Sequence, residues 1–143
     1  MASGIDRVDG GWDVHSMRGA GVSEVAVGNV MRLHIGSDQI EVHSAAELMT
    51  RGQTDTVHAA SRTNPGKAIQ LLDQVVAEVH AADSGVLKVR FANGWKLTVP
   101  PPADGLGWIV AVRGQYFIRS KPGGGVRAPD QSTLARAEQP SLG

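Results

Sequence analysis

Residues 85–104 read GVLKVRFANGWKLTVPPPAD, and this stretch decides the fold class. Apolar and polar residues alternate over residues 86–91 and again over residues 95–99, which is the period of a half-buried strand. The short loop between them ends at Gly94, which adopts the left-handed conformation at no steric cost. A run of prolines then ends the pairing, because proline has no N–H to donate. The stretch therefore predicts a β-hairpin.

This hairpin is expected to have one apolar and one polar face, because side chains alternate along a strand. The facing pairs on the apolar side are Phe91 with Trp95, Val89 with Leu97, and Leu87 with Val99. The facing pairs on the polar side are Arg90 with Lys96, and Lys88 with Thr98. The apolar side is the candidate core face, and the polar side is predominantly basic.

An earlier stretch shows the same alternation. Residues 30–36 read VMRLHIG and residues 40–43 read IEVH. A tight turn at Ser37 and Asp38 predicts that apolar residues face apolar residues and polar residues face polar ones. The expected pairs are Ile35 with Ile40, His34 with Glu41, Leu33 with Val42, and Arg32 with His43. A third hairpin is expected over residues 108–119.

A single short helix is expected between the first two hairpins. Asn64 is of a type that caps helices, and Pro65 suits the first helical turn. Ala68, Leu71 and Leu72 follow at helical spacing, which predicts a helix of about two turns.

These patterns together predict an α+β fold. It would be a mainly antiparallel sheet of about 6–8 strands, strongly bent or nearly closed, with one short helix. Residues 22–42 and 75–99 each read as strand, connector, strand, turn and strand, so internal duplication of a three-strand unit is an alternative to chance similarity. The expected core comprises Val25, Val27, Leu33, Ile35, Ile40, Val42, Leu71, Leu72, Val89, Phe91, Trp95, Leu97 and Trp108.

The expected domain organisation has three parts. Residues 1–11 would be a flexible N-terminus, residues 12–122 a single β-rich domain, and residues 123–143 a disordered polar tail.

Charge and cysteine content exclude several classes of function. The fourteen basic and fourteen acidic residues cancel, so no overall field favours nucleic acid or an anionic membrane. The chain has no cysteine, which excludes disulfides, thiolate zinc ligands and a cysteine nucleophile. The N-terminus lacks the pattern of a signal peptide, and no apolar run approaches the roughly 20 residues that span a bilayer. A cytoplasmic location is therefore expected.

No motif in the sequence indicates catalysis. The five histidines are not at helical spacing, and no serine lies in a G-x-S-x-G motif. His34, Glu41 and His43 would lie on one polar face. These three residues could in principle hold a metal ion, but a solvated polar surface is the simpler interpretation. We therefore expect no catalytic residue, no metal ligand and no cofactor.

Basic residues on the polar faces of the two hairpins are the strongest functional candidate. If both hairpins share one sheet with the same side outward, the residues that gather there are Arg32, His43, Lys88, Arg90 and Lys96. An ordinary solvated face is the competing interpretation. The functional interpretation is a docking surface for an acidic protein partner. Nucleic acid is disfavoured, because the aromatic residues that would stack bases are predicted inside the core.

Three functional hypotheses follow. The first is a non-catalytic protein-binding module of accessory or immunity type. The second is a small-ligand-binding domain that uses the mouth of the curved sheet. The third is an enzyme of unknown type. A homodimer formed through strand edges is compatible with all three.

The chain resembles a family of small, uncharacterised actinobacterial proteins, a domain of unknown function. The resemblance rests on Trp12 with Arg18 and Gly19, on residues 85–104, on Trp108, and on Pro122, Gly123 and Gly124. It implies a core of strand, Gly turn, strand and prolines, and a bacterial cytoplasmic setting. It implies no activity and no site residue.

Overall fold

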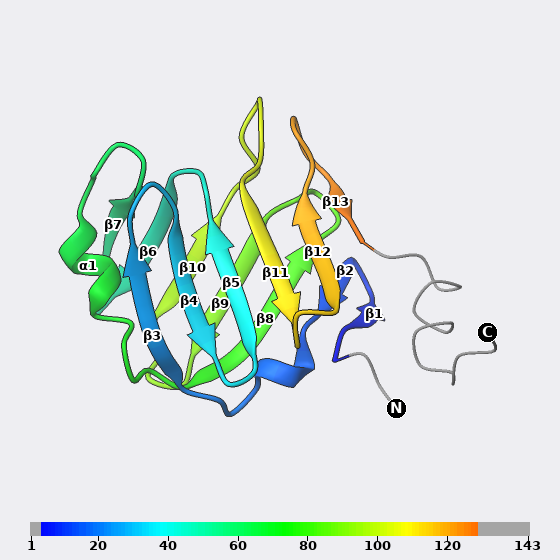
Figure 1. Ribbon diagram of the computed structural model, residues 1–143, viewed down its shortest axis with the longest axis horizontal. Coiled ribbons are helices and arrows are strands. Elements are labelled where there is room, and N and C mark those ends of the chain that lie inside the picture. The colour runs from blue at the N-terminus through cyan, green and yellow to red at the C-terminus, as the bar shows by residue number, and fades with distance from the viewer. Residues whose placement is uncertain (1–3, 129–143) are drawn as a thin grey trace.

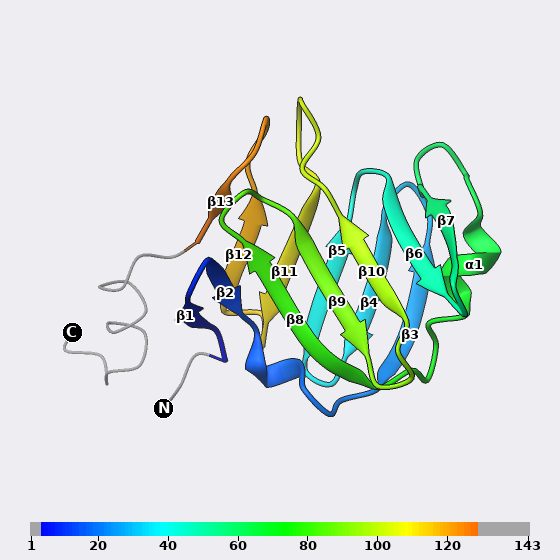
Figure 2. The same ribbon diagram turned by 180° about the vertical axis from the view of Figure 1, so that it is seen from behind.

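The apolar faces of the strands are buried between two sheets. The computed structural model describes residues 4–128 and contains one seven-stranded and one six-stranded antiparallel sheet. Figures 1 and 2 show the two sheets as layers, seen from opposite sides. Side chains from both layers form one core, in which Trp108 and Phe91 are the largest fully buried residues.

The elements have the following bounds. In spatial order, the seven-stranded sheet contains β1 (Asp6–Val8), β2 (Gly11–Asp13), β8 (Val76–Ala82), β9 (Leu87–Phe91), β10 (Lys96–Val99), β6 (Ala46–Thr50) and β7 (Gln53–Val57). The six-stranded sheet contains β13 (Val126–Arg127), β12 (Tyr116–Ser120), β11 (Trp108–Val112), β5 (Asp38–Val42), β4 (Met31–Ile35) and β3 (Val22–Val27). The helices of the described residues are a short 3-10 helix, η1 (His15–Met17), and α1 (Pro65–Ile69), which lies against β3 and β7.

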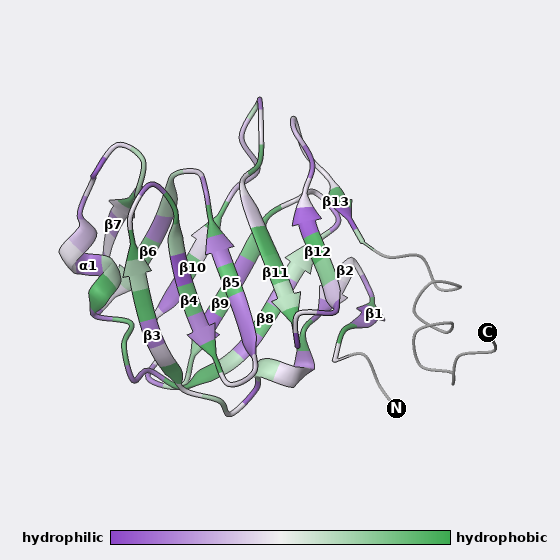
Figure 3. Cartoon of the chain, in the orientation of Figure 1, coloured by the Kyte–Doolittle hydropathy of each residue, from purple (hydrophilic) through white to green (hydrophobic). Residues whose placement is uncertain are grey.

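The two-sheet arrangement corrects the expectation of a single bent or nearly closed sheet of about 6–8 strands. The protein is mostly β rather than α+β, because α1 contains only five residues. Alternation in the sequence identifies the face that a strand buries, as along β4 and β5 in Figure 3. It does not identify the sheet that the strand joins, because pairing between distant segments decides that.

Two predicted hairpins have the expected register. In the hairpin of β9 and β10, Val89 faces Leu97, and Gly94 in the loop has a φ of 91°. In the hairpin of β11 and β12, Val112 faces Tyr116.

The hairpin of β4 and β5 is shifted by two residues from the expected register. Leu33 faces Ile40 rather than Val42. The turn lies at Gly36 and Ser37, because Gly36 supplies a φ of 61°, which favours glycine. A shift of two residues keeps every side chain on its predicted face.

Most of the predicted core is confirmed. The buried members are Leu33, Ile35, Ile40, Val42, Leu71, Val89, Phe91, Leu97 and Trp108. Val25, Val27 and Trp95 are only partly buried against the core, and Leu72 is 42% exposed. Val25 and Val27 are less covered because β3 is an edge strand.

The start of α1 differs from the prediction. Asn64 makes no side-chain capping hydrogen bond and has a left-handed φ of 50°. Its Nδ2 instead donates to the carbonyl of Thr56 at 2.6 Å. The helix ends at Ile69, so it is shorter than two turns. No helix among the described residues is long and apolar enough to cross a bilayer.

Both predicted flexible ends contain β-strands. β1 lies within the expected N-terminal segment of residues 1–11 and pairs with β2, which begins at Gly11. Arg7 donates to the carboxylate of Asp83 at 2.5 and 2.8 Å. These hydrogen bonds hold the pKa of Asp83 below its ordinary value. β13 lies within the expected tail of residues 123–143. Within the two predicted segments, residues 1–3 and 129–143 lie outside the described residues.

Two halves of the chain repeat one arrangement. Strands β3, β4 and β5 form a meander in one sheet, and β8, β9 and β10 form a meander in the other. The hairpin that follows each meander pairs with the other meander, because β6 pairs with β10 and β11 pairs with β5. Each half of the chain thus adds its hairpin to the sheet that contains the meander of the other half, an arrangement called here the exchange of hairpins.

Backbone hydrogen bonds where the meanders begin reveal a pseudo-two-fold relation. Val22 N donates to Gln74 O, and Val76 N donates to Ala20 O, both at 2.9 Å. Val22 and Val76 are separated by the same number of residues as Ala20 and Gln74. The two hydrogen bonds are therefore equivalent, with the two halves of the chain interchanged.

Local features repeat at the same offset. β3 has a bulge before Glu24, and β8 has a bulge before Glu78. Each glutamate pairs with a side chain on the next strand, His34 at 3.4 Å and Arg90 at 3.9 Å. The correspondence therefore extends from strand order to individual side chains.

The exchanged hairpins also share a turn sequence. Residues 51–53 and 113–115 both read Arg-Gly-Gln. Arg51 has a φ of 49° and Arg113 a φ of 56°, and each precedes a glycine that also has a positive φ. Non-glycine residues adopt this conformation at a cost.

Loops interlock at the end of the sandwich that is uppermost in Figure 1. Gly123 N, between β12 and β13, donates to Pro102 O between β10 and β11 at 2.9 Å. Gly125 N donates to Ser84 O, in the turn between β8 and β9, at 2.8 Å. This end is held by main-chain bonds between three loops.

Gly85 allows these loops to approach. It has a φ of 100°, and its carbonyl accepts a hydrogen bond from Trp108 Nε1 at 2.8 Å. A Cβ atom at this position would lie 2.7 Å from Gly125 N. By contrast, a Cβ atom at Gly94 would meet nothing within 4 Å.

We expect Gly85→Ala to destabilise the protein more than Gly94→Ala. Both changes place a Cβ at positive φ, which costs about 1–2 kcal/mol. Only the change at Gly85 adds a clash with backbone, worth about another 1–3 kcal/mol. Urea unfolding of the two variants measures the difference, and equal losses would show that the loops yield without cost.

We expect Arg51→Asn and Arg113→Asn each to raise the free energy of unfolding by about 0.5–1 kcal/mol. Asparagine is enriched several-fold over other non-glycine residues in the left-handed region, and that ratio sets the estimate. Chemical denaturation measures both variants. A loss of stability in either one would contradict the equivalence of the two turns.

Candidate functional site

The basic residues predicted to share one face lie on opposite sides of the molecule. Arg32 and His43 belong to the outer face of the six-stranded sheet, and Lys88, Arg90 and Lys96 to that of the seven-stranded sheet. The predicted surface required both hairpins in one sheet, and they are in different sheets. The structure therefore brings together three of the five residues.

Glu41 contacts both residues on the six-stranded sheet. Its Oε1 lies 2.9 Å from His43 Nε2, and its Oε2 accepts hydrogen bonds from Arg32 Nε at 3.4 Å and Gln39 Nε2 at 2.9 Å. Partial burial acts to raise the pKa of Glu41, but the hydrogen bonds from His43 and Arg32 outweigh it and hold the pKa below its ordinary value. Arg32 and His43 thus already have an anionic partner.

The three residues on the seven-stranded sheet form a basic row on β9 and β10. Lys88 and Arg90 alternate with buried residues along β9 and point away from the core. Arg90 directly faces Lys96, and Lys88 faces Thr98. Arg90 Nε lies 3.9 Å from Glu78, whereas Lys88 and Lys96 form no ion pair with any residue between 4 and 128.

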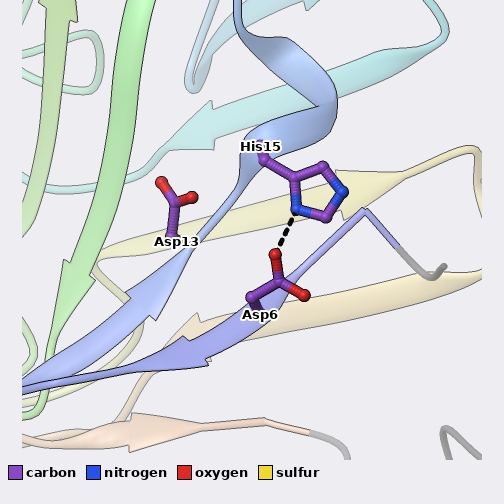
Figure 4. A group of neighbouring side chains, drawn as sticks. All are labelled: Asp6, Asp13 and His15. Atoms are coloured by element: carbon purple, nitrogen blue, oxygen red, sulfur yellow. Dashed lines mark ion pairs between the residues drawn. The ribbon is translucent and has the colours of Figure 1, made fainter.

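Asp6, Asp13 and His15 gather where β1, β2 and η1 meet (Figure 4). One ligand atom from each lies within 4.8 Å of the others, which is close enough for a shared divalent cation. However, Asp6 Oδ2 lies 2.6 Å from His15 Nδ1, and the buried Asp13 pairs with Arg18. Each carboxylate therefore already has a partner within the protein. The Asp6–His15 pair links β1 to η1, and the Asp13–Arg18 pair links β2 to the residue that follows η1.

Three further cations line a groove at the end of the sandwich where the loops interlock. Arg119 lies on β12, Lys121 directly follows β12, and Arg127 lies on β13. The groove has a volume of about 810 Å³, and Leu106 and Pro122 contribute apolar wall.

The sequence-based site omits these three residues. Arg119 and Lys121 are two residues apart, which is the spacing of one strand face. Arg127, however, follows a glycine-rich segment that predicts a tail. Only the pairing of β13 with β12 brings Arg127 opposite Arg119, and no spacing in the sequence signals that pairing.

Comparison with known proteins assigns the chain to a family. No curated protein and no solved structure matches it. Residues 13–130 match a family whose description is "Family of unknown function (DUF6188)". This match includes every strand from β3 to β13. The chain therefore belongs to this family of unknown function.

Proposed function

We propose that the protein is a non-catalytic binding module, of accessory or immunity type, that docks an acidic surface of a protein partner. The docking surface is the basic row of Lys88, Arg90 and Lys96 on the outer face of the seven-stranded sheet. The observation that carries the proposal is the direct opposition of Arg90 and Lys96 in the ladder.

Like charges placed directly opposite one another destabilise a sheet. Glu78 offsets only part of this repulsion, because it lies 3.9 Å from Arg90 and both side chains are about half exposed. An acidic partner surface would supply the missing counter-charge. An open sheet face suits a protein surface rather than a small molecule, which needs a concave site.

Comparison of the two sheets supports the choice of face. Arg32 and Lys88 occupy equivalent positions in the two meanders. Arg32 faces Glu41, whereas Lys88 faces Thr98. The position that faces the cation is therefore acidic in one sheet and uncharged in the other, so of these two cations only Lys88 lacks a counter-charge on the facing strand.

The proposal includes two wider elements. The pseudo-two-fold relation supports an origin by internal duplication, after which the outer faces diverged in charge. The family resemblance and the absence of cysteine support a bacterial cytoplasm as the setting in which the partner is met.

We expect Lys88→Glu to weaken partner binding at least about tenfold, which is about 1.4 kcal/mol. The partner is first captured from a bacterial lysate on the full-length protein and identified by mass spectrometry. Its affinity is then measured with the purified components at low and high salt, because a charged interface weakens as salt rises.

Arg32→Glu is the matched control, because it makes the same change of charge at the equivalent position on the opposite sheet. We expect it to alter the affinity less than about twofold. Equal losses in both variants would reduce the effect to overall charge, and no loss in Lys88→Glu would exclude this face.

A further inference from the structure

The groove at the end of the sandwich gathers three cations, Arg119, Lys121 and Arg127. Arg119 and Arg127 face each other in the ladder of β12 and β13. Lys121 is the first residue of the loop that joins these two strands. Within residues 4–128, none of the three forms an ion pair. Two arginines held face to face without a counter-charge repel each other.

The floor of this groove is preorganised. Ser120 lies between Arg119 and Lys121 in the chain and is only 2% exposed. Its Oγ accepts hydrogen bonds from the backbone N–H of Gly107 at 2.8 Å and of Trp108 at 3.2 Å. These bonds tie the end of β12 to the last residue of the β10–β11 loop and to the first residue of β11, so these segments are held together before any ligand arrives.

We propose that the groove binds a small organic polyanion that carries two or three carboxylate or phosphate groups. Its volume of about 810 Å³ is in the range of small-molecule sites, about 300–1,000 Å³. The two guanidinium groups suit bidentate recognition of such anions, and Lys121 adds a point charge. Leu106 and Pro122 provide apolar contact for the carbon skeleton.

This site is separate from the basic row of the proposed docking surface. The groove contains residues of β12, β13 and the loops next to them, whereas the basic row lies on β9 and β10 of the other sheet. Among residues 4–128, no aromatic side chain lines the groove, which disfavours a stacked nucleobase. A failure of either proposal leaves the other unaffected.

Calorimetric titration of the full-length protein tests the inference with three probes: citrate, inorganic pyrophosphate and acetate. Citrate carries only carboxylates and pyrophosphate only phosphates, so the two arms distinguish the sources of charge. We expect at least one of them to bind at least tenfold more tightly than acetate, with an affinity that falls as salt rises. If neither binds more tightly than acetate, the proposal is wrong.

Arg127→Gln locates the site, and Lys67→Gln is the control, because it removes one charge on α1, outside both the groove and the basic row. We expect Arg127→Gln to weaken the better probe at least tenfold and Lys67→Gln to leave it within twofold. Equal weakening by the two variants would overturn the assignment.

Thermal unfolding provides a second readout, which distinguishes a role of Arg127 in ligand binding from a purely structural role. Without ligand, Arg127→Gln should have an unchanged or higher Tm, because it removes the repulsion with Arg119. With the better probe, the wild-type Tm should rise and the Tm of the variant should not. A lower Tm in the ligand-free variant would mean that Arg127 serves the fold instead.

Discussion

The antiparallel bridge between Gly21 and Val75 sets the geometry of the sandwich. On either side of this bridge, the N–H of Val22 donates to the carbonyl of Gln74 and the N–H of Val76 donates to the carbonyl of Ala20, both at 2.9 Å. These bonds hold the first strands of the two meanders in opposite directions where they begin, before the strands continue into different sheets. The pseudo-two-fold relation follows from this bridge and its two hydrogen bonds. Each meander ends beside the place where the hairpin of the other half pairs, so the exchange of hairpins completes both sheets.

The exchange of hairpins also determines which surfaces are left exposed to a ligand or a partner protein. Each half contributes strands to both layers, so the apolar faces are covered within the sandwich and α1 lies only at the edge formed by β3 and β7. The outer faces of both sheets and the loop-bearing end remain as surfaces. The two outer faces are equivalent in backbone but different in charge, because the glutamate that pairs with Arg32 corresponds to Thr98 beside Lys88.

Local patterns in the sequence predict hairpins, faces and most of the core, because alternation and turn glycines act over a few residues. The register of β9 with β10 is predictable for that reason, since Gly94 marks the end of the loop. The β4–β5 register is not, because both Gly36-Ser37 and Ser37-Asp38 are plausible turns. The assignment of Lys88 and Arg32 to different sheets depends on pairing between distant strands, which alternation does not encode.

Both proposed sites contain cations that face each other across a ladder. The fold tolerates them because their repulsion is small compared with the total free energy of unfolding. A like-charge cross-strand pair costs a fraction of a kcal/mol to about 1 kcal/mol, against a typical total of about 5–15 kcal/mol. Arg90 with Lys96 lies on an open face where water screens the repulsion. Arg119 with Arg127 lies beside a groove with apolar wall, where screening is weaker and an anion gains more by entering. The same charge pattern therefore favours a broad protein surface in the first place and a small, highly charged ligand in the second.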